Sequence, residues 1–359
     1  MEKRHFIFLD GMRGFAALSV GFLHASWIFH LGLKPGHAYL AVDFFFCLSG
    51  FVIAYAYDDR LRTKMTFSDF WTRRLIRLYP MILIVILLGF IATLGEQLVS
   101  GTALMAQDNI ILIITLFLLP AGLLFPGGQA YPMNNPLWSL FFELFANLLY
   151  GIQQKFRPVS TRSAFVVLLL SAIALIAVIF HTGGIETIGF DGHKSFLGGF
   201  VRVFYPFFAG VILYRYSFFN IRYRIHSSIV LAALLVALLV PIFKHAWLYD
   251  AVIITLGFPL MVMFGARSFH SERLSKFLVL FGRLSFPFYV IHQPVLRICD
   301  LLIAKTGLEK TLPYPMAALS LLVALAMAYA FLVAYDQPVR RWFTKKSRDS
   351  APAKAEVLV

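Results

Sequence analysis

The sequence predicts an all-α fold, a polytopic membrane helix bundle of about ten transmembrane helices plus one re-entrant or interfacial helix, with both termini cytoplasmic. Three observations support this expectation. Hydrophobic residues make up 60% of the 359 residues and charged residues 14%, unlike the composition of a soluble domain. Apolar runs long enough for membrane-crossing helices recur along the chain. Lys and Arg gather in the polar segments between these runs.

Eleven apolar runs are candidates for the predicted helices. A helix needs about 20 mostly apolar residues to cross a bilayer, and most of the runs approach that length. No internal repeat relates one part of the series to another. The runs cover residues 6–29, 38–57, 78–98, 109–125, 136–152, 164–181, 197–214, 227–243, 248–266, 277–303 and 315–335.

The basic clusters indicate which run does not cross. Cytoplasmic loops of membrane proteins collect Lys and Arg, so we place every cluster on that side. If all runs crossed, three crossings would separate the cluster ending at Arg77 from the one beginning at Lys155, which would put them on opposite sides. We therefore assign 109–125 to the re-entrant or interfacial helix. The formal charge of +14 is then explained by the loops, and no nucleic-acid partner is expected.

The domain prediction is one membrane domain over residues 1–343, followed by a disordered basic cytoplasmic tail over 344–359. The first residues imitate a signal peptide, but Asp10 and Arg13 interrupt the apolar stretch, so we expect them to remain attached. Cys47 and Cys299 both lie within apolar runs, and no disulfide framework or metal site is indicated.

The first run, "LDGMRGFAALSVGFLHA", carries three residues that are costly in lipid. Arg13 and His24 are eleven residues apart, which places them on about the same helix face, separated by roughly 16 Å. Asp10 precedes Arg13 by three positions and can pair with it. A stripe facing a bundle cavity explains this pattern, and a snorkelling arginine with a hydrogen-bonded core histidine explains it about equally well.

The segment "FWTRRLIRLYP" places Arg73, Arg74 and Arg77 at the cytoplasmic membrane surface, directly before a crossing that begins at Pro80. Guanidinium groups match the geometry of phosphates. The general bias of cytoplasmic loops toward positive charge, with contact to anionic lipids, is the simpler alternative.

In "NNPLWSLFFELFANLLYG", the side chains of Ser139, Glu143 and Asn147 follow one another by four and form a polar stripe. Hydrogen bonds between helices account for Ser139 and Asn147, whereas a carboxylate at membrane depth needs a partner. Asp43 and Arg202 add two charges toward the outer half, where pairing with each other is the simplest explanation.

In "RLSFPFYVIHQPV", Ser285 and His292 are seven residues apart with Tyr289 between them. Pro287 and Pro294 remove backbone hydrogen bonds from the same stretch, so a local cavity is plausible. The charged and polar candidates are then distributed unequally across the membrane, with basic groups at the cytoplasmic face and His, Asp, Glu, Tyr and Arg farther out. That polarity suggests a reaction across the membrane.

Taken jointly, these motifs resemble acyltransferase family 3, the integral membrane O-acyltransferases, from Phe6 to about Arg341. The resemblance rests on the Arg13 and His24 segment, "AVDFFFCLSGFVI", "RRLIRLYP", "LWSLFFELFANLLY" and "SFPFYVIHQPV". It implies ten spans, acetyl-CoA or another acyl-CoA as a co-substrate bound from the cytoplasm, no permanently bound cofactor, and transfer to a carbohydrate or glycolipid hydroxyl outside a bacterial cytoplasmic membrane.

The resemblance also assigns roles: it puts the catalytic imidazole at His24, its companion charge at Arg13, and donor recognition at Arg74 and Arg77. Glu143 matches a further family position and joins Asp10 as a candidate for the catalytic set. Arg73 is a further candidate for the phosphates of the donor. The candidates for substrate contact are Asp43, Trp138, Ser285, Tyr289 and His292.

A neutral imidazole is suited to deprotonate the attacking hydroxyl, and we expect Glu143 or Asp43 to orient the ring of His24. A covalent acyl-histidine intermediate is the competing mechanism. The main alternative function is a secondary transporter or exporter of a small polar or glycolipid substrate, which would also carry ionisable groups in broken helices. A lipid-binding sensor is a third reading, for which replacing His24 by Ala would be harmless.

Overall fold

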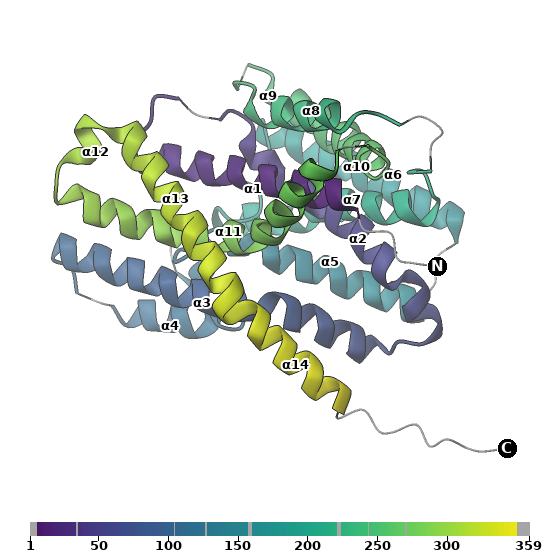
Figure 1. Ribbon diagram of the computed structural model, residues 1–359, viewed down its shortest axis with the longest axis horizontal. Coiled ribbons are helices and arrows are strands. Elements are labelled where there is room, and N and C mark those ends of the chain that lie inside the picture. Colours follow the sequence, from purple (N-terminus) through teal and green to yellow (C-terminus); the bar gives the residue numbers. More distant parts are fainter. Residues whose placement is uncertain are drawn as a thin grey trace.

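The computed structural model describes residues 6–33, 35–103, 105–125, 128–156, 160–220, 224–242, 244–269 and 271–349 (Figure 1). Within these ranges the chain is a helix bundle without a β-strand, and only two isolated bridges pair extended residues. The prediction of an all-α fold is confirmed. Four members of the basic clusters that we place on the cytoplasmic side lie outside the described residues: Lys3, Arg4, Arg157 and Arg222.

The α-helices follow one another with short connections. They are α1 (Ile7–Ile28), α2 (Ala41–Thr63), α3 (Phe67–Ser100), α4 (Ala106–Thr115), α5 (Leu137–Phe156), α6 (Thr161–Thr182), α7 (Gly192–Arg215), α8 (Ser227–Leu239), α9 (Ala246–Val252), α10 (Phe258–Gly265), α11 (Glu272–Ala304), α12 (Leu308–Thr311), α13 (Pro313–Phe331) and α14 (Gln337–Asp349). Short 3₁₀ turns lie at η1 (Ala38–Leu40) and η2 (Ala121–Leu124). The π-turns η3 (Ile253–Gly257) and η4 (Leu332–Asp336) join α9 to α10 and α13 to α14.

Seven helical segments of the described chain are long and apolar enough to cross a membrane. They are Ala38–Thr63, Phe67–Ser100, Thr161–Thr182, Gly192–Arg215, Ala246–Gly265, Leu274–Ala304 and Pro313–Lys345. Helices α1 and α5 have 22 and 20 residues and carry the polar stripes, and α8 has 13 residues. A multi-pass membrane protein is thus supported, whereas the count of ten crossings and the cytoplasmic placement of the termini stay predictions.

The run 109–125 is not one helix. Helix α4 ends at Thr115 after 10 residues, and the chain then turns through η2. Ten helical residues rise about 15 Å, roughly half the thickness of the hydrocarbon core. This segment is too short to cross as a helix, in agreement with its assignment as the piece that stays on one side.

Helix α3 differs from its predicted start. The sequence suggested a loop that ends at Pro80, but α3 begins at Phe67 and continues through Pro80 for 34 residues. Its start is fixed by a capping box, in which Thr66 and Asp69 satisfy each other's backbone N–H groups. Arg73, Arg74 and Arg77 therefore project from a helix that packs against the bundle, and not from a surface loop.

Helix α14 continues from the π-turn η4 to Asp349, so it includes the first positions of the predicted tail. The disorder predicted for 344–359 stays a prediction. Figure 1 shows α14 projecting from the bundle toward the C-terminus. Residues 350–359 lie outside the described residues.

Helices of the bundle approach one another closely at positions where one of them carries a glycine. A Cβ atom at Gly14 of α1 would lie 2.7 Å from the Phe281 ring of α11, and one at Gly21 would lie 2.6 Å from the Phe288 ring. In the same way, Gly50 of α2 and Gly210 of α7 each lie against the backbone of the other helix. Small residues at such contacts let membrane helices approach closely.

Both of these helix pairs are parallel. Contacts between α1 and α11 join Gly14 to Phe281 and Gly21 to Phe288, so both helices advance in the same direction. Ion pairs between α2 and α7 join Asp43 to Arg202 and, farther along, Asp58 to Arg215. Successive membrane crossings alternate in direction, so two parallel helices must have an odd number of crossings between them along the chain. Both pairs meet this condition if 109–125 does not cross.

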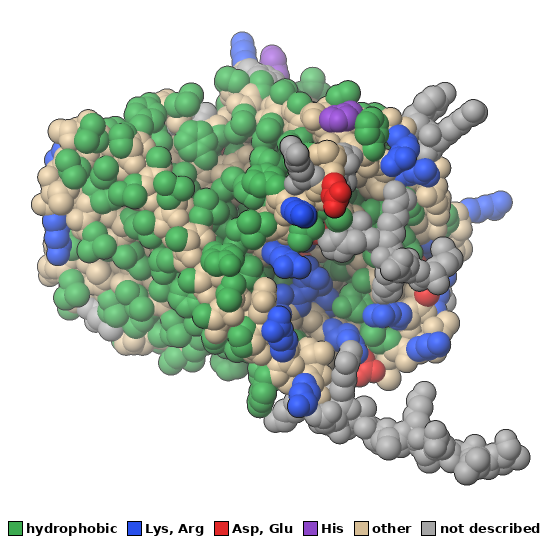
Figure 2. All heavy atoms as spheres, viewed as in Figure 1, with side chains coloured by type: hydrophobic (Ala, Val, Ile, Leu, Met, Phe, Trp, Pro, Cys, Tyr) green, Lys and Arg blue, Asp and Glu red, His purple; other side chains and the backbone are tan. Residues whose placement is uncertain are grey.

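Polar and apolar side chains are separated along the molecule. Figure 2 shows hydrophobic side chains over the left and centre of this face, whereas most Lys and Arg gather on the right, toward the end where the N-terminus lies. This separation is the pattern expected of a protein with one basic face outside the membrane.

Candidate active site

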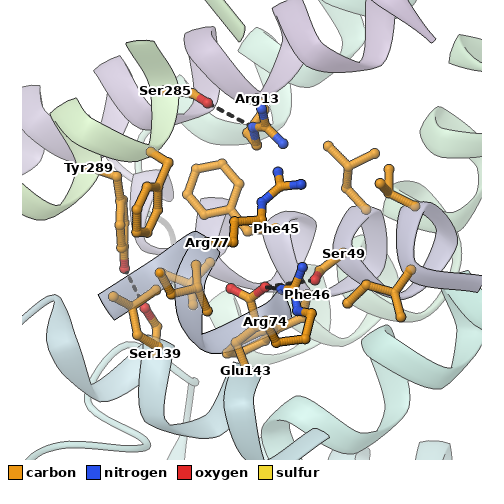
Figure 3. Close-up of a pocket in the computed structure, with 17 residues that line it drawn as sticks. Arg13, Phe45, Phe46, Ser49, Arg74, Arg77, Ser139, Glu143, Ser285 and Tyr289 are labelled. Atoms are coloured by element: carbon orange, nitrogen blue, oxygen red, sulfur yellow. Dashed lines mark hydrogen bonds and ion pairs between the residues drawn. The ribbon is translucent and has the colours of Figure 1, made fainter. Parts of the chain in front are cut away.

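A pocket opens between α1, α2, α3, α5 and α11, with about 760 Å³ of space including its mouth. Many of the predicted site residues line it, although they come from segments far apart in the sequence (Figure 3). They are Arg13, Arg74, Arg77, Glu143, Ser285 and Tyr289, together with Ser139. Apolar side chains of α2, among them Phe45 and Phe46, form much of the remaining wall.

Arg13 is held at the top of the pocket by α11. Its Nε donates to Ser285 Oγ at 2.7 Å, and its Nη2 donates to the carbonyl oxygen of Gly282 at 2.9 Å. The predicted ion pair with Asp10 is confirmed, with Nη2 and Oδ1 at 3.3 Å. The close approach of α1 and α11 at Gly282 brings these groups together, since a Cβ there would lie 2.5 Å from the Cβ of Asp10.

Arg74 and Glu143 form the opposite wall. Arg74 Nη2 donates to Glu143 Oε1 at 2.8 Å, and Ser49 Oγ donates to the same oxygen at 2.9 Å. Asn147, the next member of the α5 stripe, donates to the carbonyl oxygen of Glu143 at 2.7 Å. In the sequence, Ser49 is a single polar residue in an apolar run, so nothing marks it as a site residue.

The guanidinium groups of the pocket retain unused N–H groups. Arg74 is only 4% exposed, yet its Nε is buried without a hydrogen-bond partner. Figure 3 shows Arg77 pointing into the pocket between Arg13 and Arg74, and among the described residues it has no hydrogen bond and no ion pair within 4 Å. Arg73 lies on an exposed face of α3 and does not line the pocket.

These unused donors define what the pocket can bind. Three guanidinium groups face one carboxylate, that of Glu143, with Asp10 beside Arg13. Arginine forks bind phosphate and carboxylate oxygens with paired, charge-assisted hydrogen bonds. The pocket therefore suits an anionic ligand with several acceptor oxygens.

His24 lies beyond this pocket, in contact with His292 of α11. The Nδ1 of His24 and the Nε2 of His292 are 2.7 Å apart, and the two rings are nearly parallel at a centroid distance of 4.9 Å. Tyr289 separates the histidines from the pocket: its ring centroid is 6.0 Å from that of His292, and its hydroxyl bonds Ser139 Oγ at 2.8 Å. The structure thus orients His24 with His292, where the sequence had suggested Glu143 or Asp43.

Asp43 and Trp138 belong to a different, closed cluster. Both oxygens of Asp43 accept from Arg202, at 3.0 and 2.7 Å, and the charged carbon of Arg202 lies 4.9 Å from the Trp138 ring centroid. Asp43 and Arg202 are at most 1% exposed. Pairing with each other, the simplest explanation from the sequence, is the arrangement found, and neither residue lines the pocket.

Asn134 supports the part of α11 that carries His292, and the sequence analysis did not identify it. Its Nδ2 donates at 2.9 Å to the carbonyl oxygen of Val290, four residues before Pro294. Proline has no N–H, so it leaves that carbonyl without its helical partner. The neighbouring Asn135 donates its backbone N–H to Gln293 Oε1 at 2.6 Å. Pro294 itself was the signal, because it predicts an acceptor at Val290 that some other residue must satisfy.

Comparison with known proteins gives one consistent family. A family model for an acyltransferase domain, acyltransferase family 3, matches residues 6–335. O-acetyltransferase OatA of Staphylococcus aureus is 24% identical over 315 residues, covering 80% of this chain and 50% of that protein. "Protein 2 in picA locus" of Rhizobium radiobacter is 36% identical over 156 residues, covering 41% and 81%. Acyltransferase MdmB of Streptomyces mycarofaciens is 33% identical over 148 residues, covering 38% and 35%. The chain thus spans about half the length of OatA. No solved structure matches.

Proposed function

Since the chain belongs to acyltransferase family 3, we propose that it is a membrane O-acyltransferase that moves an acyl group, in the simplest case acetyl, from acyl-CoA to a carbohydrate hydroxyl. The observation that carries this proposal is the arginine pocket, whose unused N–H groups lie on the same helix bundle as a buried histidine pair. The donor would bind from the cytoplasm, and the acceptor would be an extracytoplasmic or membrane-linked carbohydrate.

The donor end of the site is the arginine pocket. Arg13, Arg74 and Arg77 would hold phosphate oxygens of the coenzyme, with Glu143 keeping Arg74 in place. Arg13 and His24 lie eleven residues apart on the continuous helix α1, a rise of roughly 16 Å. An extended pantetheine arm can cover such a distance and would carry the thioester past Tyr289 to the histidines.

The chemical step needs a base at the inner end of that path. His24 takes the proton of the acceptor hydroxyl while its oxygen attacks the thioester carbonyl carbon. The tetrahedral intermediate collapses as the carbon–sulfur bond breaks, and His24 returns the proton to the thiolate of the coenzyme. The products are an ester of the carbohydrate and free CoA, so all atoms and charges balance.

The names of two relatives give a reaction type and no acceptor: they describe an O-acetyltransferase and an acyltransferase. We propose an exopolysaccharide, a lipopolysaccharide or another glycolipid as the acceptor for this chain, and the bacterial inner membrane as its location. Contact with lipid is implied by the exposed apolar helix surface.

The test uses inside-out membrane vesicles that contain either the wild-type protein or His24→Ala, with a crude carbohydrate acceptor in the lumen. Acetyl-labelled CoA is added outside, and the label is followed into lumenal carbohydrate. We expect transfer by the wild type and at least a 100-fold loss in His24→Ala, since general-base catalysis contributes about 10²–10⁴-fold.

The matched control is His181→Ala, which removes an exposed histidine at the end of α6 and should transfer normally. Equal label in the wild type and His24→Ala would contradict the base role. Movement of unmodified carbohydrate without ester formation would instead favour the transporter.

A further inference from the structure

The two buried histidines are part of a hydrogen-bond chain that ends on the protein backbone. His292 Nδ1 lies 3.2 Å from the carbonyl oxygen of Phe288, and His292 Nε2 lies 2.7 Å from His24 Nδ1. His292 is fully enclosed. Each of its two ring nitrogens therefore has one fixed neighbour.

The backbone carbonyl decides which nitrogens carry protons. A carbonyl oxygen only accepts, so Nδ1 of His292 carries the hydrogen that it donates to Phe288. A neutral imidazole has one N–H, which leaves Nε2 of His292 as an acceptor. His24 must then donate from its Nδ1. Consequently Nε2 of His24 is unprotonated and holds the free lone pair.

That lone pair is not used by the protein. His24 is 8% exposed, and among the described residues its Nε2 has no hydrogen-bond partner. The edge of Trp27 lies on the same side of α1, with ring centroids 5.2 Å apart. Nε2 is therefore left for a reactant, whereas Nδ1 is occupied by His292.

The surroundings keep His292 from changing its partner. The Phe288 ring stacks against it at 5.6 Å and in turn fills the space left by Gly21 of α1. One residue beyond His292, Gln293 accepts from Asn135, and Asn134 donates to Val290 two residues before it. The backbone of α11 is thus held on both sides of His292.

We propose that His292 is a positioning residue, which fixes His24 in the tautomer with hydrogen on Nδ1 and so presents Nε2 as the base. The consequence for catalysis rests on the proposed function, whereas the tautomer itself does not. With the opposite tautomer, His24 would present an N–H group and would act as a hydrogen-bond donor or acid. When His24 takes up a proton on Nε2, the bond from its Nδ1 to His292 stabilises the imidazolium.

The tautomer is measured directly by ¹⁵N NMR of the full-length protein, labelled at histidine and reconstituted in lipid. The signals of His24 and His292 are assigned from the spectra of His24→Gln and His292→Gln. We expect Nδ1 of His24 to carry the hydrogen and Nε2 to be unprotonated. A hydrogen on Nε2 of neutral His24 would overturn the proposal.

Three substitutions at His292 supply the kinetic test. Gln can place an oxygen near the position of Nε2, Leu has no acceptor, and Asn is polar but too short to reach His24. We expect His292→Gln to keep kcat within about tenfold of wild type, and His292→Leu and His292→Asn to lose at least 100-fold in kcat, with the donor KM changed less than twofold.

Each outcome has one meaning. Equal losses in Gln and Asn would overturn the acceptor role, as would full activity in Leu or Asn. If Leu does not fold, the comparison of Gln with Asn still decides. If His24→Gln remains active while NMR shows the expected tautomer, the base assignment fails and the tautomer fixed by His292 stands.

Discussion

Two arginine clusters in this bundle differ in how completely their N–H groups are used. Arg202 has five N–H groups, and five acceptors surround it: both oxygens of Asp43 and the carbonyl oxygens of Ile185, Ile188 and Tyr39. In the pocket, Arg74 leaves its buried Nε unpaired, and Arg77 has no hydrogen bond to the described residues.

The difference separates a structural charge from a binding charge. Burial without a partner is costly, so a fully satisfied arginine such as Arg202 joins helices and has nothing left for a ligand. At the pocket wall, the buried Nε of Arg74 costs stability unless a ligand satisfies it, whereas Arg77 is exposed and its N–H groups are open to water or a ligand. Four variants test this contrast, beginning with the largest expected effect.

Arg202→Ala should have the largest effect on stability. It leaves the carboxylate of Asp43 buried without a countercharge, which typically costs about 3–5 kcal/mol. We expect a large fall in the thermal unfolding temperature of the purified protein in detergent, together with a low yield. An unchanged unfolding temperature would show that the cluster does not hold α2 and α7 together.

Arg77→Ala should affect the donor and not the fold. Hydrogen bonds to charged groups contribute roughly 1.5–3 kcal/mol, so the donor KM should rise about 10- to 100-fold. The unfolding temperature should stay near that of the wild type, because the described residues give Arg77 no hydrogen bond to lose. A stability loss as large as that of Arg202→Ala would show that Arg77 also has a structural role, which would contradict the distinction between the two arginines.

Glu143→Gln should have a smaller effect. It removes the countercharge of Arg74 but keeps an amide oxygen that can still accept, so we expect a stability loss of about 1 kcal/mol and no rise in the donor KM. Steady-state kinetics also test the catalytic role that the family resemblance suggested for Glu143. A 100-fold fall in kcat would assign it to the chemical step.

Arg73→Ala should have the smallest effect. Arg73 is exposed and lies outside the pocket, although it is adjacent to Arg74 in the sequence. Surface substitutions of this kind usually stay within about 0.5 kcal/mol. We expect less than a twofold change in donor KM, so that it serves as the matched control for Arg77→Ala. A tenfold change would place the phosphate contacts farther out on α3.

Local pairs could be predicted from the sequence, because helix geometry fixes them. The pairing of Asp10 with Arg13 and the alignment of Ser139, Glu143 and Asn147 follow from spacings of three and four residues. The start of α3 could not be predicted in the same way, because Pro80 resembles a helix start, whereas the capping box of Thr66 and Asp69 sets the actual one.

Long-range partners could not be predicted, because spacing carries no information about them. His24 and His292 are 268 positions apart, and many carboxylates were equally available as partners. Asp43 illustrates the reverse case: a charge at membrane depth suggests a site, yet Arg202 satisfies it completely. Only the three-dimensional arrangement shows which buried charges are already paired.

The parallel packing of α1 on α11 fixes the distance between the two ends of the candidate site. At Gly14 and Gly21 the two helices touch with the same offset, so neither can slide without collisions along the whole contact. Arg13 is hydrogen-bonded to α11 at one end of this helix contact, and His24 is hydrogen-bonded to α11 at the other end. The interval between them cannot adapt to the molecule that spans it. If the proposed function holds, this fixed interval would select a donor by the length of its arm.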